Sequence, residues 1–158
     1  SIQFLCQDMK NLENLGMYAG IFCLCDSFNY ILSYEEVDAF FHEVSTHLRT
    51  NGLFFFDTHS LDRLDEFKSE YNETGAFEDG CQYQWSIMAE DDYVYQDFAF
   101  YRKDQVIQEP HIQRVYDPEW LSNTLSKYFE IVKVTTDFDI PGISSGEKYF
   151  YVCRKKEK

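Results

Sequence analysis

The stretch between residues 20 and 57 constrains the fold more than any other part of the sequence. Residues 20–25 form an almost continuous apolar run, which is typical of a parallel strand covered on both faces. A second apolar run, residues 53–56, ends at Asp57. The segment between the two runs has the pattern of an amphipathic helix. The order strand, helix, strand predicts an open parallel sheet with a right-handed crossover.

The helix between these runs is the best specified element. Ser33 and Glu36 stand at capping-box spacing, in which the hydroxyl accepts from the Glu36 amide and the carboxylate reaches back. Apolar residues then follow at helical spacing and form one stripe: Val37, Phe40, Phe41, Val44 and Leu48. Asn51 and Gly52 are expected to end the helix, with Gly52 in the left-handed conformation that most side chains resist.

Further elements are expected before and after this unit. Residues 2–6 are apolar and predict another buried strand, and a second helix is expected to begin near Ser60. Strand-like runs separated by short polar breaks predict a three-stranded antiparallel meander over residues 81–116.

The end of the chain again has the pattern of a helix followed by strands. Asp117 and Pro118 have the residue types of a helix N-cap and first helical position. Two strands, 131–136 and 148–153, follow with a loop between them. The chain is therefore interpreted as an α/β core, residues 1–80 and 117–158, that carries an antiparallel insertion at residues 81–116.

Charge and hydropathy limit the partners of this domain. The formal net charge is -14, with 14 basic against 28 acidic residues. Nucleic acid binding depends on Lys and Arg, and anionic lipid would be repelled, so neither nucleic acid nor a membrane surface is expected as a partner. No apolar run reaches the ~18 residues of a membrane helix. A cationic or neutral small molecule suits the charge better.

The five cysteines predict neither a disulfide framework nor a metal site. Their number is odd, and Cys23 and Cys25 lack the spacing of zinc ligands. The favoured interpretation is buried free thiols in a reducing cytoplasm.

Three segments together resemble the class I S-adenosylmethionine-dependent methyltransferases, in the branch of small-molecule enzymes with an antiparallel insertion. The first is Gln7-Asp8-Met9 directly after a predicted strand. The second, residues 21–30, is similar to the family's fourth strand and the loop over the methyl group. The third, residues 47–57, is similar to its turn into the fifth strand. The closing helix and strand pair resemble the sixth and seventh strands, so the resemblance covers nearly the whole chain and implies a partial Rossmann-like sheet of strands three to seven.

The resemblance implies S-adenosyl-L-methionine as cofactor and a small molecule as methyl acceptor. By position, Asp8 would accept from the adenine amino group, although an Asp after a strand can also simply cap a turn. Met9 would pack on the ring, although it could also be core filler. Three residues at the end of the fourth strand complete the implied cofactor contacts: Leu24, Cys25 and Asp26.

Other residues are candidates for the methyl acceptor and for a base. Asn29 and Tyr30 could frame the acceptor or serve only in loop packing, and Tyr83 and Trp85 could belong to a lid or to ordinary half-buried sheet. A base is needed only if the acceptor must lose a proton. Two histidines are candidates for it, although a lone histidine is more often structural: His59 and His111.

A feature of the family is missing from the sequence. No Gly-x-Gly stands in the chain, whereas the family's first strand ends in a glycine-rich cofactor loop. The chain is therefore interpreted as an N-terminally truncated fragment that binds the cofactor weakly or not at all. The fourth strand would then have an open edge, so either residues 2–6 pair with residues 21–25 or two chains associate at that edge. Association is the favoured outcome.

Two other classes remain open from the sequence. A nicotinamide-dependent oxidoreductase has a similar sheet, but gives no reason for the Asp8-Met9 pair or the antiparallel ending. A catalytically inactive α/β domain could bind a protein through its aromatic meander.

Overall fold

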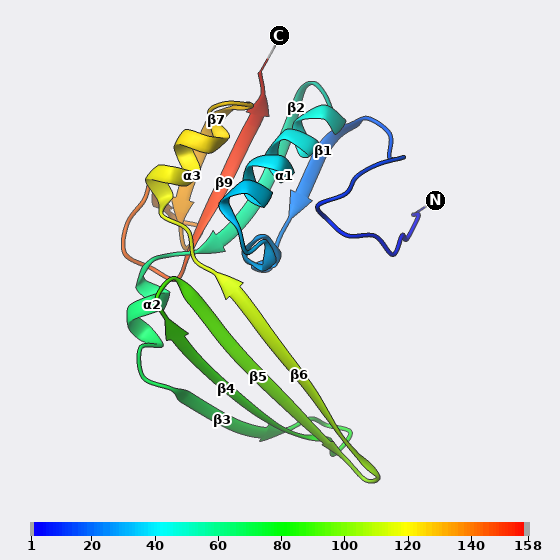
Figure 1. Ribbon diagram of the computed structural model, residues 1–158, viewed down its shortest axis with the longest axis vertical. Coiled ribbons are helices and arrows are strands. Elements are labelled where there is room, and N and C mark those ends of the chain that lie inside the picture. The colour runs from blue at the N-terminus through cyan, green and yellow to red at the C-terminus, as the bar shows by residue number, and fades with distance from the viewer. Residues whose placement is uncertain (1, 157–158) are drawn as a thin grey trace.

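The computed structural model describes residues 2–156 and contains two β-sheets (Figure 1). The core sheet has the strand order β1-β2-β9-β7-β8, and the meander sheet has the order β3-β4-β5-β6. The core-sheet strands are β1 (Tyr18–Cys23), β2 (Leu48–His59), β7 (Phe129–Thr136), β8 (Ile140–Pro141) and β9 (Lys148–Lys155). The meander-sheet strands are β3 (Tyr71–Ala76), β4 (Gln82–Glu90), β5 (Tyr93–Arg102) and β6 (Gln105–Arg114).

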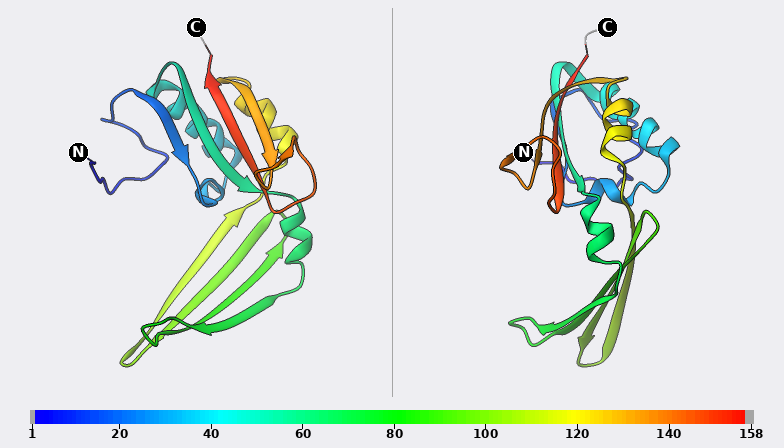
Figure 2. Two further views of the ribbon diagram at one scale, coloured as in Figure 1. Left: turned by 180° about the vertical axis from the view of Figure 1, so that it is seen from behind. Right: turned by 90° about the vertical axis from the view of Figure 1, so that its left-hand side faces the viewer.

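The helices divide between the two sheets. Helix α1 (Tyr34–His47) and helix α3 (Pro118–Leu125) pack on the same face of the core sheet (Figure 2). The short 3-10 helix η1 (Ser27–Tyr30) follows β1, and α2 (Asp62–Glu66) leads from the end of β2 into the meander sheet. The meander sheet extends from the end of the core sheet at which β1 and β2 finish (Figure 1).

The topology confirms the α/β fold expected from the sequence. Strands β1 and β2 are parallel and are joined through α1, as the strand-helix-strand pattern predicted. Strand β9 lies antiparallel to both β2 and β7 and is inserted between them, although it follows both in sequence. If β1, β2, β7 and β9 correspond to the family's strands four, five, six and seven, this is the order four, five, seven, six that the resemblance implies.

Both predicted helix caps are present. The Ser33 hydroxyl accepts from the Glu36 amide at 3.1 Å and donates to the Glu36 carboxylate at 3.3 Å. Asp117 accepts from the amides of Glu119 and Trp120, each at 2.9 Å, and Pro118 begins the helix as expected. Because each cap satisfies amides that have no partner within the helix, these two starts could be located from the sequence alone.

The end of α1 differs from the expectation. Strand β2 begins at Leu48, directly after the helix, and the left-handed residue is Asn51, with φ of 58°, rather than Gly52. Asn is one of the side chains that tolerate this conformation. Gly52 is required for another reason, because a Cβ there would lie 2.9 Å from the Arg49 carbonyl oxygen and 3.1 Å from the Leu48 side chain.

The antiparallel insertion is larger than the sequence indicated. It has four strands, because β3 precedes the three that were predicted. The helix expected from Ser60 is reduced to α2, and its apolar residues face the meander sheet rather than the parallel strands. Leu64 and Phe67 pack with a small buried cluster there: Ile87, Val94 and Val115.

The predicted strand at residues 2–6 is not formed. Ile2, Phe4 and Leu5 are exposed, and no strand lies beside them in the part of the chain that the structure describes. An apolar run becomes a strand only where a neighbour satisfies its backbone groups. The connection to β1 is also near the lower limit for a parallel crossover, so the run does not pair with β1.

The cysteines differ partly from the expectation of buried thiols. Cys23, Cys81 and Cys153 are buried and free, whereas Cys6 and Cys25 are free but exposed. No helix among residues 2–156 is long and apolar enough to cross a membrane.

Candidate functional site

Polar groups gather where β1 and β2 end, at the same edge of the core sheet. Cys25 and Asp26 follow β1 and both adopt left-handed backbone conformations, with φ of 60° and 57°. Non-glycine residues rarely hold this conformation, and such strain is concentrated at binding sites. The chain reversal brings the Asp26 amide to the carboxylate of Asp57 on β2, at 3.3 Å.

Lys148, the first residue of β9, joins the two carboxylates. Its Nζ lies 2.8 Å from Asp26 Oδ1 and 3.3 Å from Asp57 Oδ2. Burial opposes the ammonium charge, but the bond to Asp26 and the fields of both carboxylates outweigh it and raise the pKa of Lys148. With one cation against two carboxylates, this cluster carries a net negative charge.

His59 stands beside the cluster and is only 5% exposed. Its Nδ1 lies 3.7 Å from Asp26 Oδ1 and has no hydrogen-bond partner. Burial lowers the pKa of His59, and the opposing effects of Asp26 and of a bond to Gln113 do not restore it. The imidazole is therefore neutral at neutral pH and has a free ring nitrogen on the side of Asp26.

Asn29 fixes the backbone around this histidine. It is fully buried; its side-chain oxygen accepts from the His59 amide at 3.1 Å, and its Nδ2 donates to Thr58 Oγ1 at 3.0 Å. Nδ2 also donates to the Arg114 carbonyl at 2.6 Å, which ties the end of β6 to the core sheet. These contacts match the alternative in which Asn29 serves only in loop packing.

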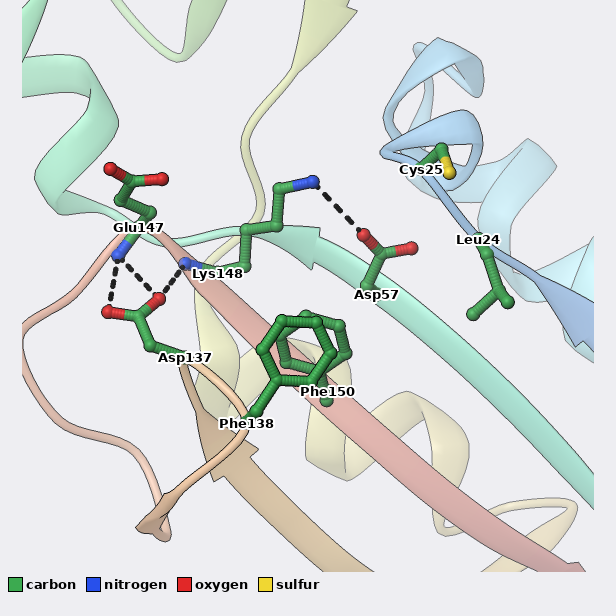
Figure 3. A pocket seen from close by; sticks show the side chains of 8 residues that line it. All are labelled: Leu24, Cys25, Asp57, Asp137, Phe138, Glu147, Lys148 and Phe150. Atoms are coloured by element: carbon green, nitrogen blue, oxygen red, sulfur yellow. Dashed lines mark hydrogen bonds and ion pairs between the residues drawn. The ribbon is translucent and has the colours of Figure 1, made fainter.

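A cavity of about 620 Å³ opens beside the cluster. Figure 3 shows its lining, with Lys148 reaching toward Asp57 and Phe138 lying over Phe150. The lining residues are Leu24, Cys25, Asp57, Asp137, Phe138, Glu147, Lys148 and Phe150. The Asp137 carboxylate accepts from the Glu147 and Lys148 amides and so holds the loop after β7 against the start of β9.

A second cavity, of about 450 Å³, lies beside β1 and η1. Met9, Leu24 and Tyr30 are among its lining residues, so Leu24 borders both cavities. Asp8 is exposed, and its carboxylate accepts from the Lys10 amide at 2.9 Å. This turn-capping bond is the alternative already recognised for Asp8.

Several candidate residues lie away from the cluster. The Tyr30 hydroxyl is 2.7 Å from Nδ1 of His111, at the surface between η1 and β6. Tyr83 donates to Glu73 at 2.7 Å within the meander sheet, distant in the sheet register from the end of β6 that meets the core. Trp85 lies in the meander sheet, and its indole Nε1 donates to Gln96 of β5 at 3.1 Å.

Lys148 of the cluster was not recognised from the sequence, and neither was Gln113, which bonds to His59, nor Gln96, which bonds to Gln113. Strand periodicity gave one signal for Gln113. It alternates with His111 on β6 and with the buried Val115 just after the strand, so it is a polar residue at an inward position. Lys148 comes from the other end of the chain, and only the antiparallel pairing of β9 with β2 places it opposite His59.

The residues present fit part of the cofactor. The apolar cavity lined by Met9 and Leu24 suits a flat ring. A backbone cradle for the amino-acid end of the cofactor has no counterpart among residues 2–156, since the chain has no Gly-x-Gly.

Comparisons with known proteins agree with this description. No protein-family model matches the chain. It is 28% identical over 169 residues to YqeM of Bacillus subtilis (strain 168) and 27% identical over 164 residues to a protein of Geobacillus sp. (strain WCH70), both named as methyltransferases. The matches cover 99% and 98% of this chain but 66% of each relative, so the chain spans slightly less than two thirds of their length.

Solved structures show the same relationship. An S-adenosylmethionine-dependent methyltransferase from Clostridium acetobutylicum ATCC 824 superimposes with a TM-score of 0.85 and 26% identity, over 97% of this chain and 64% of that one. The CcbJ methyltransferase from Streptomyces caelestis, at 15% identity and a TM-score of 0.76, shares the fold over 95% of this chain and 66% of that one. The resemblance to class I S-adenosylmethionine-dependent methyltransferases is thus confirmed in sequence and in fold.

Proposed function

We propose that this chain is part of a methyltransferase that transfers the methyl group of S-adenosyl-L-methionine to a small molecule. The observation that carries the proposal is the similarity, over nearly the whole chain, to a solved S-adenosylmethionine-dependent methyltransferase. The polar cluster at the carboxyl ends of β1 and β2 supports it, because ligands of open parallel sheets bind at this edge. Similarity to methyltransferases weighs against the nicotinamide-dependent alternative.

The cofactor is proposed to lie along the end of β1. Met9 and Leu24 would contact the adenine ring in the cavity they share, and Asp8 would accept from its amino group. Cys25 and Asp26 would contact the part of the cofactor nearest the methyl group. The sulfonium supplies an activated methyl group, so the protein mainly has to align the acceptor and exclude water.

The acceptor is proposed to be an amine in the 620 Å³ cavity. Three carboxylates line this cavity against one ammonium, Lys148, and this balance favours a cationic ligand. KedS8 from Streptoalloteichus sp ATCC 53650, a solved structure that shares the fold at a TM-score of 0.72 and 13% identity, is a sugar N-methyltransferase. Its activity is consistent with such an acceptor.

His59 is proposed as the base, because it is neutral, buried and has a free nitrogen beside Asp26. The amine must be unprotonated to attack the methyl group and must lose a proton afterwards. His111 remains a second proposal through its contact with Tyr30. Asn29, Tyr83 and Trp85 would act on the acceptor only indirectly.

The cofactor assignment is tested by Asp8→Ala in the protein that contains this chain. Losing the bond to the adenine amino group should weaken S-adenosylmethionine binding by about 1 to 3 kcal/mol, measured by titration calorimetry. Asp104→Ala, which changes another exposed carboxylate at the far end of the meander sheet, is the matched control. Unchanged affinity in a folded Asp8→Ala variant would return Asp8 to the role of a turn cap.

The activity itself is tested by transfer of labelled methyl groups to a panel of primary amines and matched alcohols. We expect transfer to amines and its loss in His59→Gln. An inactive protein-binding domain would give no transfer to any acceptor and no cofactor binding.

A further inference from the structure

A chain of hydrogen bonds crosses the meander sheet and ends at His59. The Trp85 indole Nε1 donates to Gln96 Oε1 at 3.1 Å, and Gln96 Nε2 donates to Gln113 Oε1 at 2.8 Å. Gln113 Nε2 in turn donates to the Asp26 carbonyl at 3.2 Å. The Nε2 atom of His59 lies 3.1 Å from the same Gln113 Oε1.

The two ends of this chain set the direction of every bond within it. An indole N–H can only donate, so Gln96 must present its oxygen to Trp85 and its NH2 group to Gln113. A backbone carbonyl can only accept, so Gln113 must turn its NH2 group toward Asp26. Both constraints require the same orientation of Gln113, with Oε1 facing Gln96 and His59.

His59 therefore meets an atom that can only accept. A neutral imidazole carries its proton on one nitrogen, and a hydrogen bond to Gln113 Oε1 forms only if that nitrogen is Nε2. We propose that Trp85, Gln96 and Gln113 are positioning residues that hold His59 as the Nε2–H tautomer, so that Nδ1 is the atom that accepts a proton. In the absence of Gln113, the nearby Asp26 carboxylate would favour the opposite tautomer, with the proton on Nδ1.

The consequence for the reaction rests on the proposed function. As the amine nitrogen bonds to the methyl carbon, the carbon–sulfur bond breaks and the nitrogen must release one proton. That proton would be taken up at Nδ1 of His59, on the side of the ring that faces Asp26. The Asp26 side chain is more exposed than the His59 ring. The resulting imidazolium would be stabilised by the Asp26 carboxylate and opposed by the cations of Arg63 and Lys148.

The tautomer can be measured without any activity. Nitrogen-15 spectra of the histidine side chains distinguish a protonated ring nitrogen from an unprotonated one, and His59→Gln assigns the His59 signals. We expect a protonated Nε2 and an unprotonated Nδ1 at neutral pH. A protonated Nδ1 in the unaltered chain would overturn the proposal, even if the protein proves to be a methyltransferase.

Variants of Gln113 test the cause. Gln113→Met keeps the length of the side chain but removes its hydrogen bonds, and the population of the Nδ1–H tautomer should rise. Gln113→Glu retains an acceptor and should preserve the Nε2–H tautomer while raising the pKa of His59. Gln108→Met, at an exposed position on the same strand, is the control and should change neither.

Activity gives the second readout, in the protein that contains this chain. In Gln113→Met we expect kcat to fall and its pH profile to change. A tautomer that stays the same in all three variants would show that Gln113 does not control it. If the unaltered protein shows the expected tautomer but transfers no methyl group, the proposed function would be refuted instead.

Discussion

The core sheet and the meander sheet are stabilised in different ways. Aromatic rings fill the core sheet: Phe56 stacks on Tyr151 with ring centroids 4.9 Å apart, and both side chains are almost fully buried. The meander sheet buries only a small apolar cluster, and most of its aromatic residues stay half exposed. Hydrophobic burial is the main source of folding stability, so the core sheet should supply most of it. The meander sheet instead brings polar side chains to the site.

Polar contacts attach the meander sheet to the core at the end of β6. Arg114 bonds to Asp92 within the meander sheet and donates to the Leu32 carbonyl at 2.9 Å, on the core side. Its guanidinium also lies 4.2 Å from the ring centre of Tyr34. The residue directly before Arg114 on β6 is Gln113, whose side chain donates to the Asp26 carbonyl. The same strand end therefore both holds the insertion and sets the environment of His59.

The largest expected effect comes from removing a core ring. Phe56→Ala should lower the free energy of unfolding by about 3 to 5 kcal/mol, because it leaves a cavity among rings that cannot close around it. The half-buried Phe100 of the meander sheet is the matched control, and Phe100→Ala should cost about 1 kcal/mol. Urea denaturation followed by circular dichroism measures both. Equal losses would contradict the contrast between the two sheets.

A smaller effect is expected where the sheets join. Arg114→Met should cost about 1.5 to 3 kcal/mol, the range for hydrogen bonds to a charged group. Because these contacts join the meander sheet to the core, amide hydrogen exchange should quicken in β5 and β6 more than in β2 and β9. Exchange that quickens equally in both sheets would show that Arg114 supports the whole domain. Arg102→Met, at the exposed far end of β5, should leave exchange in both sheets unchanged.

Alkaline pH should lower the free energy of unfolding, because the core sheet buries thiol and phenol groups in their protonated form. Burial raises the pKa of the Cys23 and Cys153 thiols from 9.0 to about 12, and for Cys23 the charge of Asp57 adds to this. The folded state thus keeps protons that the unfolded chain has lost. The stabilising contribution is complete below pH 9 and is lost as the pH rises toward 12.

The loss of stability is measured by comparing the midpoint of urea unfolding below pH 9 with midpoints between pH 9 and 12. The buried hydroxyls of Tyr116 and Tyr151 act in the same direction, since burial raises their pKa too. Replacing both Cys23 and Cys153 with Ala should reduce the slope of stability against pH. Cys6→Ser, at an exposed position, should leave the slope unchanged. A slope that is the same in all three proteins would assign the effect to other groups.

The smallest expected effect concerns association through β1. This strand is paired only with β2 among the residues described, and its Phe22 is 64% exposed. Unpaired strand edges favour pairing with another chain. Light scattering should therefore show a mass that rises with concentration, and Phe22→Lys should reduce the rise. Val106→Lys, at an exposed position of the meander sheet, should not. A monomer at every concentration would contradict the prediction.

Local signals predicted the core sheet better than the site. The Ser33 and Asp117 caps and the apolar runs depend on neighbours in sequence. They located the starts of α1 and α3 and predicted that β1 and β2 exist, but not where α1 ends or where the two strands begin and end. Residues 2–6 carried the same apolar signal and still formed no strand, because pairing requires a partner that the pattern does not specify.

The site depends on contacts between distant parts of the chain. Asp26 and His59 could be proposed as site residues from the sequence, because each comes just after an apolar run and the two runs end at the same edge of a parallel sheet. Lys148 and Gln113 lie 91 and 54 residues from their partners Asp57 and His59. No local pattern in the sequence encodes such pairings, since they arise only when the antiparallel strands take their register.

The most direct test of the account is an NMR titration of this chain with S-adenosylmethionine. The core-sheet edge, and not the meander sheet, is proposed to hold the cofactor. A large excess of ligand should shift the backbone resonances of residues 8–9 and 24–26 and leave the far end of the meander sheet, residues 102–105, unchanged. Weak binding is sufficient for this result. Shifts confined to the meander sheet would contradict the account.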